Sequence, residues 1–320
     1  MVGGAPSAPR RAQQPPRFRH AAHLTVAPAR GAYLAYRAGA EVARFLPESV
    51  GAPIARGLAQ LVGFGFMPAR VRQIERNLRR VYGPEFGGVA LHRSVAATFD
   101  SYGRYFYELF RLPGTPQEWI DAHVQVTGAE HLDAAAAAGR GVLLALPHLG
   151  NWDFAGAWLA GRGYPVTVVA EPVEPPELFD WFVETRRRIG MRVIALSPTA
   201  GAEALAALRA NEAVCLLCDR DLTGDGVDVD FFGEQTTLPA GPATLALRGG
   251  APLIPAASYF RAHGAHDIRI LPPVPVERTG RIRADVARVT QELARRFEEL
   301  IRAEPEHWHL LQPNWPSDRE

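Results

Sequence analysis

A histidine and an aspartate, His148 and Asp153, follow the apolar segment GVLLALP with four residues between them. A neutral histidine can take a proton from a hydroxyl group, and a carboxylate on its second ring nitrogen fixes the required tautomer. Asn151 is a good N-cap residue, so the segment predicts a strand, a turn and a helix. The N–H groups of the Gly150–Trp152 turn can then hold an oxyanion. In the alternative interpretation, Asp153 only balances the helix dipole and His148 is a turn residue.

A second predicted strand also ends in polar residues. Glu171 follows the apolar segment PVTVVA, and an arginine triplet that begins with Arg186 lies near the end of the next predicted helix. One of these arginines can face the sheet end and bind a phosphate. The triplet can equally be a solvated helix end that complements the helix dipole.

The third strand end is the most acidic part of the chain. The segment AVCLLC is followed by Asp219, Arg220 and Asp221, and Asp228 lies further along. One of these acids can be the partner of the histidine, and a divalent-metal site is a second interpretation, although the spacing does not match an EF-hand loop. A solvated acidic loop is the third. Because ligands bind beyond the carboxyl ends of strands in open α/β sheets, these three strand ends are where the chemistry is expected.

The elements that must position these groups follow from apolar periodicity. Two helices are expected over 31–66, with breaks at Pro47 and Pro53, and further helices over 70–83 and 89–110. From residue 124 onward predicted strands alternate with helices, and a last amphipathic helix spans about 282–303. The segment GVDVDFFG is expected to be a loop with a short strand. Repeated strand–helix units predict an α/β fold with a central, mostly parallel or mixed sheet flanked by helices.

The same pattern predicts the domain organisation. Residues 1–29 are rich in Pro, Ala and Arg and contain no acid, so a disordered basic tail is expected. No linker divides the remainder, which predicts one domain over 30–320, with a helical cap at 30–112 and an α/β core at 113–320. The apolar run GLAQLVGFGFM is too short to span a bilayer. It is expected either to lie on a membrane surface as an amphipathic helix or to pack on the core.

Composition excludes several classes of protein. The two cysteines, Cys215 and Cys218, are too few for a disulfide scaffold, and within a strand they would point to opposite faces, which argues against a metal or redox pair. There is no G-x-S-x-G, Walker A, strand-linked G-x-G-x-x-G or H-E-x-x-H motif, so serine hydrolases, P-loop nucleotidases, dinucleotide oxidoreductases and zincins lose their usual support. All 35 basic residues are arginine, which excludes lysine Schiff-base chemistry.

The overall net charge of +1 conceals an uneven distribution. Residues 1–112 contain 16 arginines and six acids, a net charge of +10, whereas residues 113–320 contain 19 arginines and 28 acids, a net charge of −9. A basic N-terminal third suggests an anionic partner, either nucleic acid or a lipid surface.

Four segments together resemble a known family. LPHLGNWDFAG, RRRIG, CDRDLTGDGVDVDFFGEQTTLPAGPATLALRGGAPLIPA and EPEHWHLLQPNW resemble the lysophospholipid acyltransferase superfamily, and within it the bacterial lipid A (lauroyl/myristoyl) acyltransferases. The forms HLGNWD and DRDLT are most similar to the actinobacterial phosphatidylinositol mannoside acyltransferases. The Gram-negative lipid A enzymes usually have Glu at the position of Asp153, and this departure argues against a lipid A substrate.

The resemblance implies transfer of a fatty acyl group, typically palmitoyl, from acyl-CoA to a mannose 6-hydroxyl of a phosphatidylinositol mannoside. It implies that His148 is the general base and Asp153 its partner, with no metal and no cofactor. Further residues are expected to bind substrate, and these are Asn151, Trp152, Glu171, Arg186, Asp219, Arg220, Asp221 and Asp228. Of the two anionic partners it selects the membrane surface, on the cytoplasmic face where acyl-CoA is available, and not nucleic acid. The alternatives are another lipid acceptor such as a lysophospholipid or glycolipid, a hydrolase, and a lipid-surface protein without catalysis.

Overall fold

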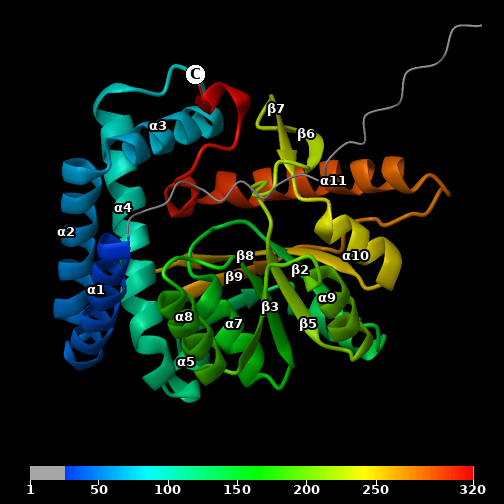
Figure 1. Cartoon of the computed structure of the whole chain (residues 1–320), viewed down its shortest axis with the longest axis horizontal. Helices are drawn as coiled ribbons and strands as arrows, with labels where there is room; N and C mark the ends of the chain where they lie inside the picture. The colour runs from blue at the N-terminus through cyan, green and yellow to red at the C-terminus, as the bar shows by residue number, and fades with distance from the viewer. Residues whose placement is uncertain (1–25, 320) are drawn as a thin grey trace, which may run out of the picture.

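The computed structural model describes residues 26–319 (Figure 1). Most of the predicted tail over 1–29 therefore lies outside the described residues, and its last four residues begin helix α1. The predicted α/β fold class is confirmed. A seven-stranded sheet has the order β1-β9-β8-β2-β5-β3-β4, and β6 and β7 form a separate antiparallel pair. The strands are β1 (Val124–Thr127), β2 (Val142–Leu146), β3 (Val166–Ala170), β4 (Met191–Ala195), β5 (Ala213–Leu217), β6 (Val227–Phe231), β7 (Glu234–Leu238), β8 (Leu253–Phe260) and β9 (His266–Ile270).

The central strands β8, β2, β5, β3 and β4 all run parallel to one another. Strand β9 is antiparallel to β8, and β1 is parallel to β9, so the sheet is mixed at this edge. Strand β2 is apolar at every position because both of its faces are covered. Leu143 and Ala145 belong to one core cluster, and Val142 and Leu144 belong to the other.

Helices cover both faces of the sheet. The α/β part contains α5 (Gln117–Ala122), α6 (Ala129–Ala137), α7 (Trp152–Gly161), α8 (Pro176–Arg188), α9 (Ala200–Arg209), α10 (Gly241–Gly249) and α11 (Ile282–Ala303). Side chains of α9, α10 and α11 pack in the core cluster of one face, and side chains of α6 and α7 pack in that of the other.

The first four helices form the N-terminal part of the molecule, which stands beside the α/β layers in Figure 1. They are α1 (Val26–Phe45), α2 (Glu48–Phe66), α3 (Pro68–Tyr82) and α4 (Gly88–Arg111). The chain breaks at Pro47 as predicted, but the break expected at Pro53 is wrong, since this residue lies inside α2. The short strand predicted within GVDVDFFG is β6, which forms a two-stranded hairpin with β7 and packs on α11. Strand β7 was not predicted.

Helix α2 has an unusual distribution of side chains. Small residues recur at every fourth position of α2: Gly51, Ala55, Ala59 and Gly63. The two glycines are buried, and a Cβ at Gly63 would clash with the ring of Phe99 on α4. The large apolar side chains Ile54, Leu58, Leu61 and Phe66 are instead 48–77% exposed. No single helix within residues 26–319 is long and apolar enough to cross a membrane; α2 and α3 meet the criteria only as a pair, bent by 104° at their junction.

Candidate active site

The strand register brings His148 and Asp219 together. Strands β2 and β5 are neighbours with Leu146 opposite Leu217, and each of the two polar residues follows two positions later. His148 Nδ1 lies 2.5 Å from Asp219 Oδ1, and the backbone N–H of His148 donates to Asp219 Oδ2 at 3.0 Å. The downstream acid that the sequence left open as a partner of the histidine is therefore Asp219 in this geometry.

The Asp219 carboxylate is completely buried and accepts a further hydrogen bond from the indole Nε1 of Trp308 at 2.8 Å. Burial alone would raise the pKa of this carboxyl, but the adjacent imidazole and the hydrogen bonds outweigh burial and lower it. The carboxylate is thus ionised where it meets the ring. Because it occupies Nδ1, Nε2 is the nitrogen of His148 left to exchange a proton with a substrate.

The expectation that Asp153 pairs with His148 is wrong. Asp153 lies in the first turn of α7 and faces α8 and α4, where Arg186 Nε and Nη2 donate to its two oxygens at 2.7 and 3.1 Å. Tyr105 Oη donates to the same carboxylate at 2.8 Å. The bidentate ion pair, with Asp153 1% exposed, joins α7 to α8 at the site. Arg186 is therefore paired with Asp153, and it also lines the cavity described below.

Asn151 caps helix α7, as its residue type predicts. Its Oδ1 accepts the backbone N–H of Phe154 at 2.9 Å, and its Nδ2 donates to the partly buried carboxylate of Glu108 at 2.7 Å. Gly150, before it, has a φ of 63°, and its N–H donates to His307 O at 2.9 Å. That N–H is therefore not available to an oxyanion, in contrast to the expectation for this turn.

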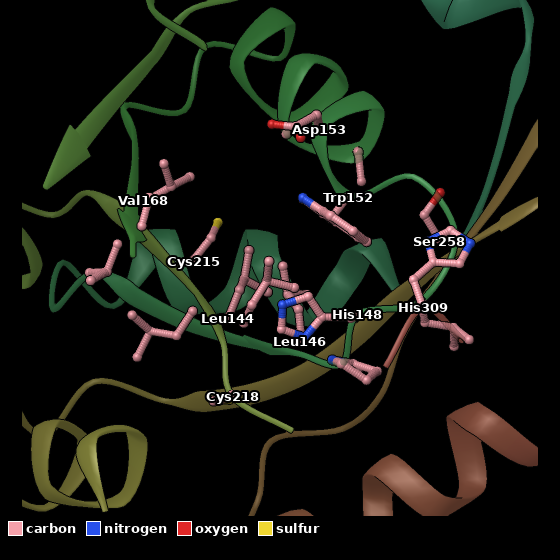
Figure 2. Close-up of a pocket in the computed structure, with 18 of the residues that line it drawn as sticks. Leu144, Leu146, His148, Trp152, Asp153, Val168, Cys215, Cys218, Ser258 and His309 are labelled. Atoms are coloured by element: carbon pink, nitrogen blue, oxygen red, sulfur yellow. The ribbon is translucent and has the colours of Figure 1, made fainter. Parts of the chain in front are cut away.

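Trp152 remains a candidate donor. Its ring lies 5.5 Å from the ring of His148, centroid to centroid, and Figure 2 shows it between Asp153 and His148. Its indole N–H is buried and has no hydrogen-bond partner within the described part of the chain. A buried donor without a partner is costly unless a ligand satisfies it.

The remaining predicted residues separate into two groups. Glu171 and Arg220 follow the neighbouring strands β3 and β5, form an ion pair of 2.9 Å and line the cavity described below. Asp221 instead holds its own loop, since it accepts N–H bonds from Thr223, Gly224 and Gly226. Asp228 is exposed on β6 and does not line the cavity. Within residues 26–319 no group of acids, histidines and cysteines is arranged to hold a metal ion.

A cavity of about 450 Å³ runs from His148 between α7 and the sheet. This volume lies within the usual range for small-molecule sites. Figure 2 shows His148, Trp152 and Asp153 around it together with apolar side chains of the strands. Much of the apolar lining comes from strands of the sheet and from α7, and it includes Leu144, Leu146, Val168, Met191, Cys215, Ala256, Ile268, Ile270, Gly156 and Leu159.

Sequence reasoning missed several residues of the site. Tyr105 lies within the helix predicted over 89–110, away from the three strand ends, and its hydroxyl donates a hydrogen bond to Asp153. Trp308 and His309 come from the segment EPEHWHLLQPNW, which carried the resemblance but was given no role. The ring of His309 lines the cavity, its Nε2 lies 2.8 Å from Ser101 Oγ, and burial holds its pKa well below the usual range, so that this ring is neutral. The only signal in the sequence was a concentration of Trp and His near the end of the chain.

Comparisons of the sequence with known proteins show what the chain is similar to. The sequence profile of the family described as bacterial lipid A biosynthesis acyltransferase matches residues 20–317. A phosphatidylinositol mannoside acyltransferase of Mycobacterium tuberculosis is 42% identical to the chain over 77% of each sequence. The protein of that name from Mycolicibacterium smegmatis is 40% identical over 89% of this chain and 91% of its own length. The lipid A biosynthesis lauroyltransferase of Escherichia coli is 29% identical over 71% of this chain and 74% of its own length.

Proposed function

The chain belongs to the bacterial lipid A biosynthesis acyltransferase family, and we propose that it transfers a long-chain acyl group, palmitoyl, from acyl-CoA to a mannose hydroxyl of phosphatidylinositol mannosides. The observation that carries the proposal is the His148–Asp219 pair at the head of a mainly apolar cavity. The acceptor is inferred from the mycobacterial relatives, which share 40–43% identity with the chain, whereas two relatives named as lipid A biosynthesis enzymes share 29–33%.

The proposed reaction is a direct transfer with His148 as general base. Nε2 takes the proton of the mannose hydroxyl while that oxygen attacks the thioester carbonyl carbon. The tetrahedral intermediate then collapses, the C–S bond breaks, and the imidazolium returns the proton to the leaving thiolate of CoA. Asp219 holds the ring through Nδ1 and stabilises its positive charge during the reaction, an arrangement typically worth about 10²–10⁴ in rate.

Two parts of the site would hold the substrates. The apolar cavity between α7 and the sheet suits an alkyl chain, with the thioester at its head beside His148. The unpartnered indole N–H of Trp152 is our candidate donor to the thioester oxygen, since it lines the same cavity. The Glu171–Arg220 pair lies where polar groups of CoA or of the glycolipid headgroup would enter.

We propose further that the protein works on the cytoplasmic surface of the membrane. Helix α2 packs on α4 through small residues, and its large apolar side chains Ile54, Leu58, Leu61 and Phe66 are exposed. In a surface helix of a water-soluble protein, large apolar side chains normally face the core instead. Exposed arginines on the same part of the chain, Arg37, Arg44, Arg56 and Arg72, suit anionic phosphoinositide headgroups. Such a helix can lie at the interface with its apolar side chains in the acyl region.

The proposed function is tested by mass spectrometry of the product formed from palmitoyl-CoA and a mannosylated phosphatidylinositol. The expected product is the acceptor with one added palmitoyl ester, and fragmentation shows whether the ester is on mannose. Parallel reactions offer a lysophospholipid, another glycolipid and water alone. Acylation of a different acceptor in preference would overturn the proposed substrate, and release of free fatty acid in step with CoA would indicate a hydrolase. His148→Ala, with folding verified by circular dichroism, is expected to give no product above background.

A further inference from the structure

The C-terminal segment is bound directly to the loop that carries His148. His309 N donates to His148 O at 2.7 Å, and Gly150 N donates to His307 O at 2.9 Å. Between them Leu149 and Trp308 form an antiparallel β-bridge. A short two-stranded clamp thus fixes the backbone on both sides of Leu149, from a part of the chain about 160 residues away in sequence.

The Trp308 side chain extends this clamp to the carboxylate. Its Nε1 donates to Asp219 Oδ2 at 2.8 Å, beside the His148 backbone N–H on the same oxygen. Within residues 26–319 no arginine lies within ion-pair distance of Asp219, in contrast to Asp153, which has Arg186. The buried carboxylate therefore depends on two neutral N–H donors and the imidazole, and a lost donor cannot be replaced by water because the carboxylate is not exposed.

The segment is itself held in place by helix α3. Asp318 Oδ2 accepts a hydrogen bond from Gln73 Nε2 at 2.8 Å, and Asp318 Oδ1 forms an ion pair with Arg80 Nη2 at 2.8 Å. Arg70 Nη1 donates to Leu311 O at 2.6 Å, and Asn77 Nδ2 donates to Leu310 O at 2.7 Å. Arg76 Nη1 also donates to Asp318 O at 2.6 Å. Three arginines of the basic N-terminal third therefore anchor the C-terminal segment that carries Trp308.

We propose that Trp308 is a positioning residue for the acyl transfer: its indole N–H occupies Asp219 Oδ2, so that Oδ1 is kept in line with His148 Nδ1. The inference rests on the proposed role of His148 as general base. Phenylalanine at position 308 would retain a buried aromatic ring and remove the donor. The carboxylate would then keep only the His148 backbone N–H on Oδ2, and with one donor fewer it would bind a proton, or an imidazolium, more strongly.

Other titratable or charged groups face the pair from every side. They are Cys218 and Arg220 in the segment of Asp219, Glu171 after β3, Tyr105 on α4, Asp153 and Arg186 across the cavity, and His307 and His309 in the C-terminal segment. All of them are retained in Trp308→Phe, so a change in pH dependence reports the missing indole donor.

The test compares Trp308→Phe with Trp315→Phe. Trp315 is fully buried in the same C-terminal segment, and its Nε1 donates to Phe231 O at 3.2 Å, away from Asp219. Trp308→Phe is expected to lower kcat about 10- to 100-fold with KM nearly unchanged, as for a hydrogen bond to a charged group. The acid limb of kcat/KM should move to higher pH by roughly half a unit to one unit. Trp315→Phe should lower thermal stability without either change.

A second readout needs no substrate. The strongly hydrogen-bonded His148 Nδ1 proton is expected as a downfield line in the proton NMR spectrum, absent from His148→Ala. It should shift or broaden in Trp308→Phe and persist in Trp315→Phe. If Trp308→Phe does not fold, 3-benzothienyl-alanine at position 308 keeps the bicyclic ring and lacks the N–H.

The outcomes separate the two proposals. A wild-type kcat, pH profile and NMR line in a folded Trp308→Phe variant would overturn the positioning role. Equal effects of the two Trp variants would assign both residues to general stability, and would overturn it as well. If no tested acceptor is acylated but the NMR line responds to Trp308→Phe alone, the positioning role stands and the proposed substrate fails.

Discussion

Replacement of Asp219 by asparagine tests the assignment of the histidine's partner. Asp219 Oδ1 meets His148 Nδ1 at 2.5 Å, while Oδ2 accepts two N–H donors at 2.8 and 3.0 Å. An amide has one accepting oxygen and one donating nitrogen. If the oxygen keeps the two N–H donors, the amide N–H faces Nδ1 and forces the proton to Nε2, where it blocks general-base catalysis.

The size of the effect follows from this change of tautomer. Loss of general-base catalysis is expected to lower kcat about 10²- to 10⁴-fold with a nearly unchanged KM, because Asp219 is buried and contacts the base rather than the substrate. Asp153→Asn should act differently. It breaks the bidentate pair with Arg186 and leaves a largely buried cation, which is expected to lower the free energy of unfolding by about 3–5 kcal/mol.

The assay measures CoA release from palmitoyl-CoA with mannosylated phosphatidylinositol, at saturating and at low acceptor, for wild type and both variants. Unfolding midpoints in urea are measured on the same preparations. Asp219→Asn is expected to be nearly inactive while folded, and Asp153→Asn to be unstable. A fully active Asp219→Asn, together with an inactive Asp153→Asn of wild-type stability, would refute the assignment and restore Asp153 as the partner.

Three further predictions concern the loop, acid stability and the membrane. Gly150→Ala should reduce kcat at least tenfold, measured in the same assay, because its φ of 63° is unfavourable for alanine and the new Cβ would collide with Ser258 O. Backbone N–H bonds hold the pKa of Asp318 below its usual value despite burial. The ionised Asp318 carboxylate therefore stabilises the fold above the pKa of the unfolded state, and this contribution is lost as the pH falls through the lower pKa of the folded state. Asp318→Asn should flatten the acid side of a plot of melting temperature against pH. Leu58→Ser with Leu61→Ser should weaken flotation with phosphatidylinositol vesicles at least tenfold and leave the melting temperature almost unchanged, since these side chains are 55% and 63% exposed; unaltered flotation would contradict α2 as the contact.

Much of the fold could be predicted from local patterns. The alternation of apolar strands with amphipathic helices indicated an α/β sheet, and the last helix was expected over 282–303, where the structure has it. Errors occurred where tertiary packing overrides local preference. Pro53 stays within α2, and residues 234–238, for which no strand was predicted, form β7 and pair with the predicted short strand β6.

The site could be predicted only in part. Three strand ends with polar residues were recognised, and β2, β5 and β3 are indeed neighbours in the sheet. Proximity in sequence suggested Asp153 as the partner of His148. Asp153 lies in the first turn of α7, however, and this helix directs its side chain toward Arg186 of α8. The neighbour of His148 was decided by the register of two strands about 70 residues apart.

The sequence by itself determined the fold class, the polar strand ends and the resemblance to an acyltransferase family, because these depend on residue type and short spacing. Only the tertiary structure decided which acid meets His148, that Arg186 is engaged with Asp153, and that Trp308 reaches Asp219. Strand order, register and the return of the C-terminal segment bring distant residues into contact. Those contacts depend on how whole helices and strands pack together, so they cannot be predicted from the spacing of residue types within one element.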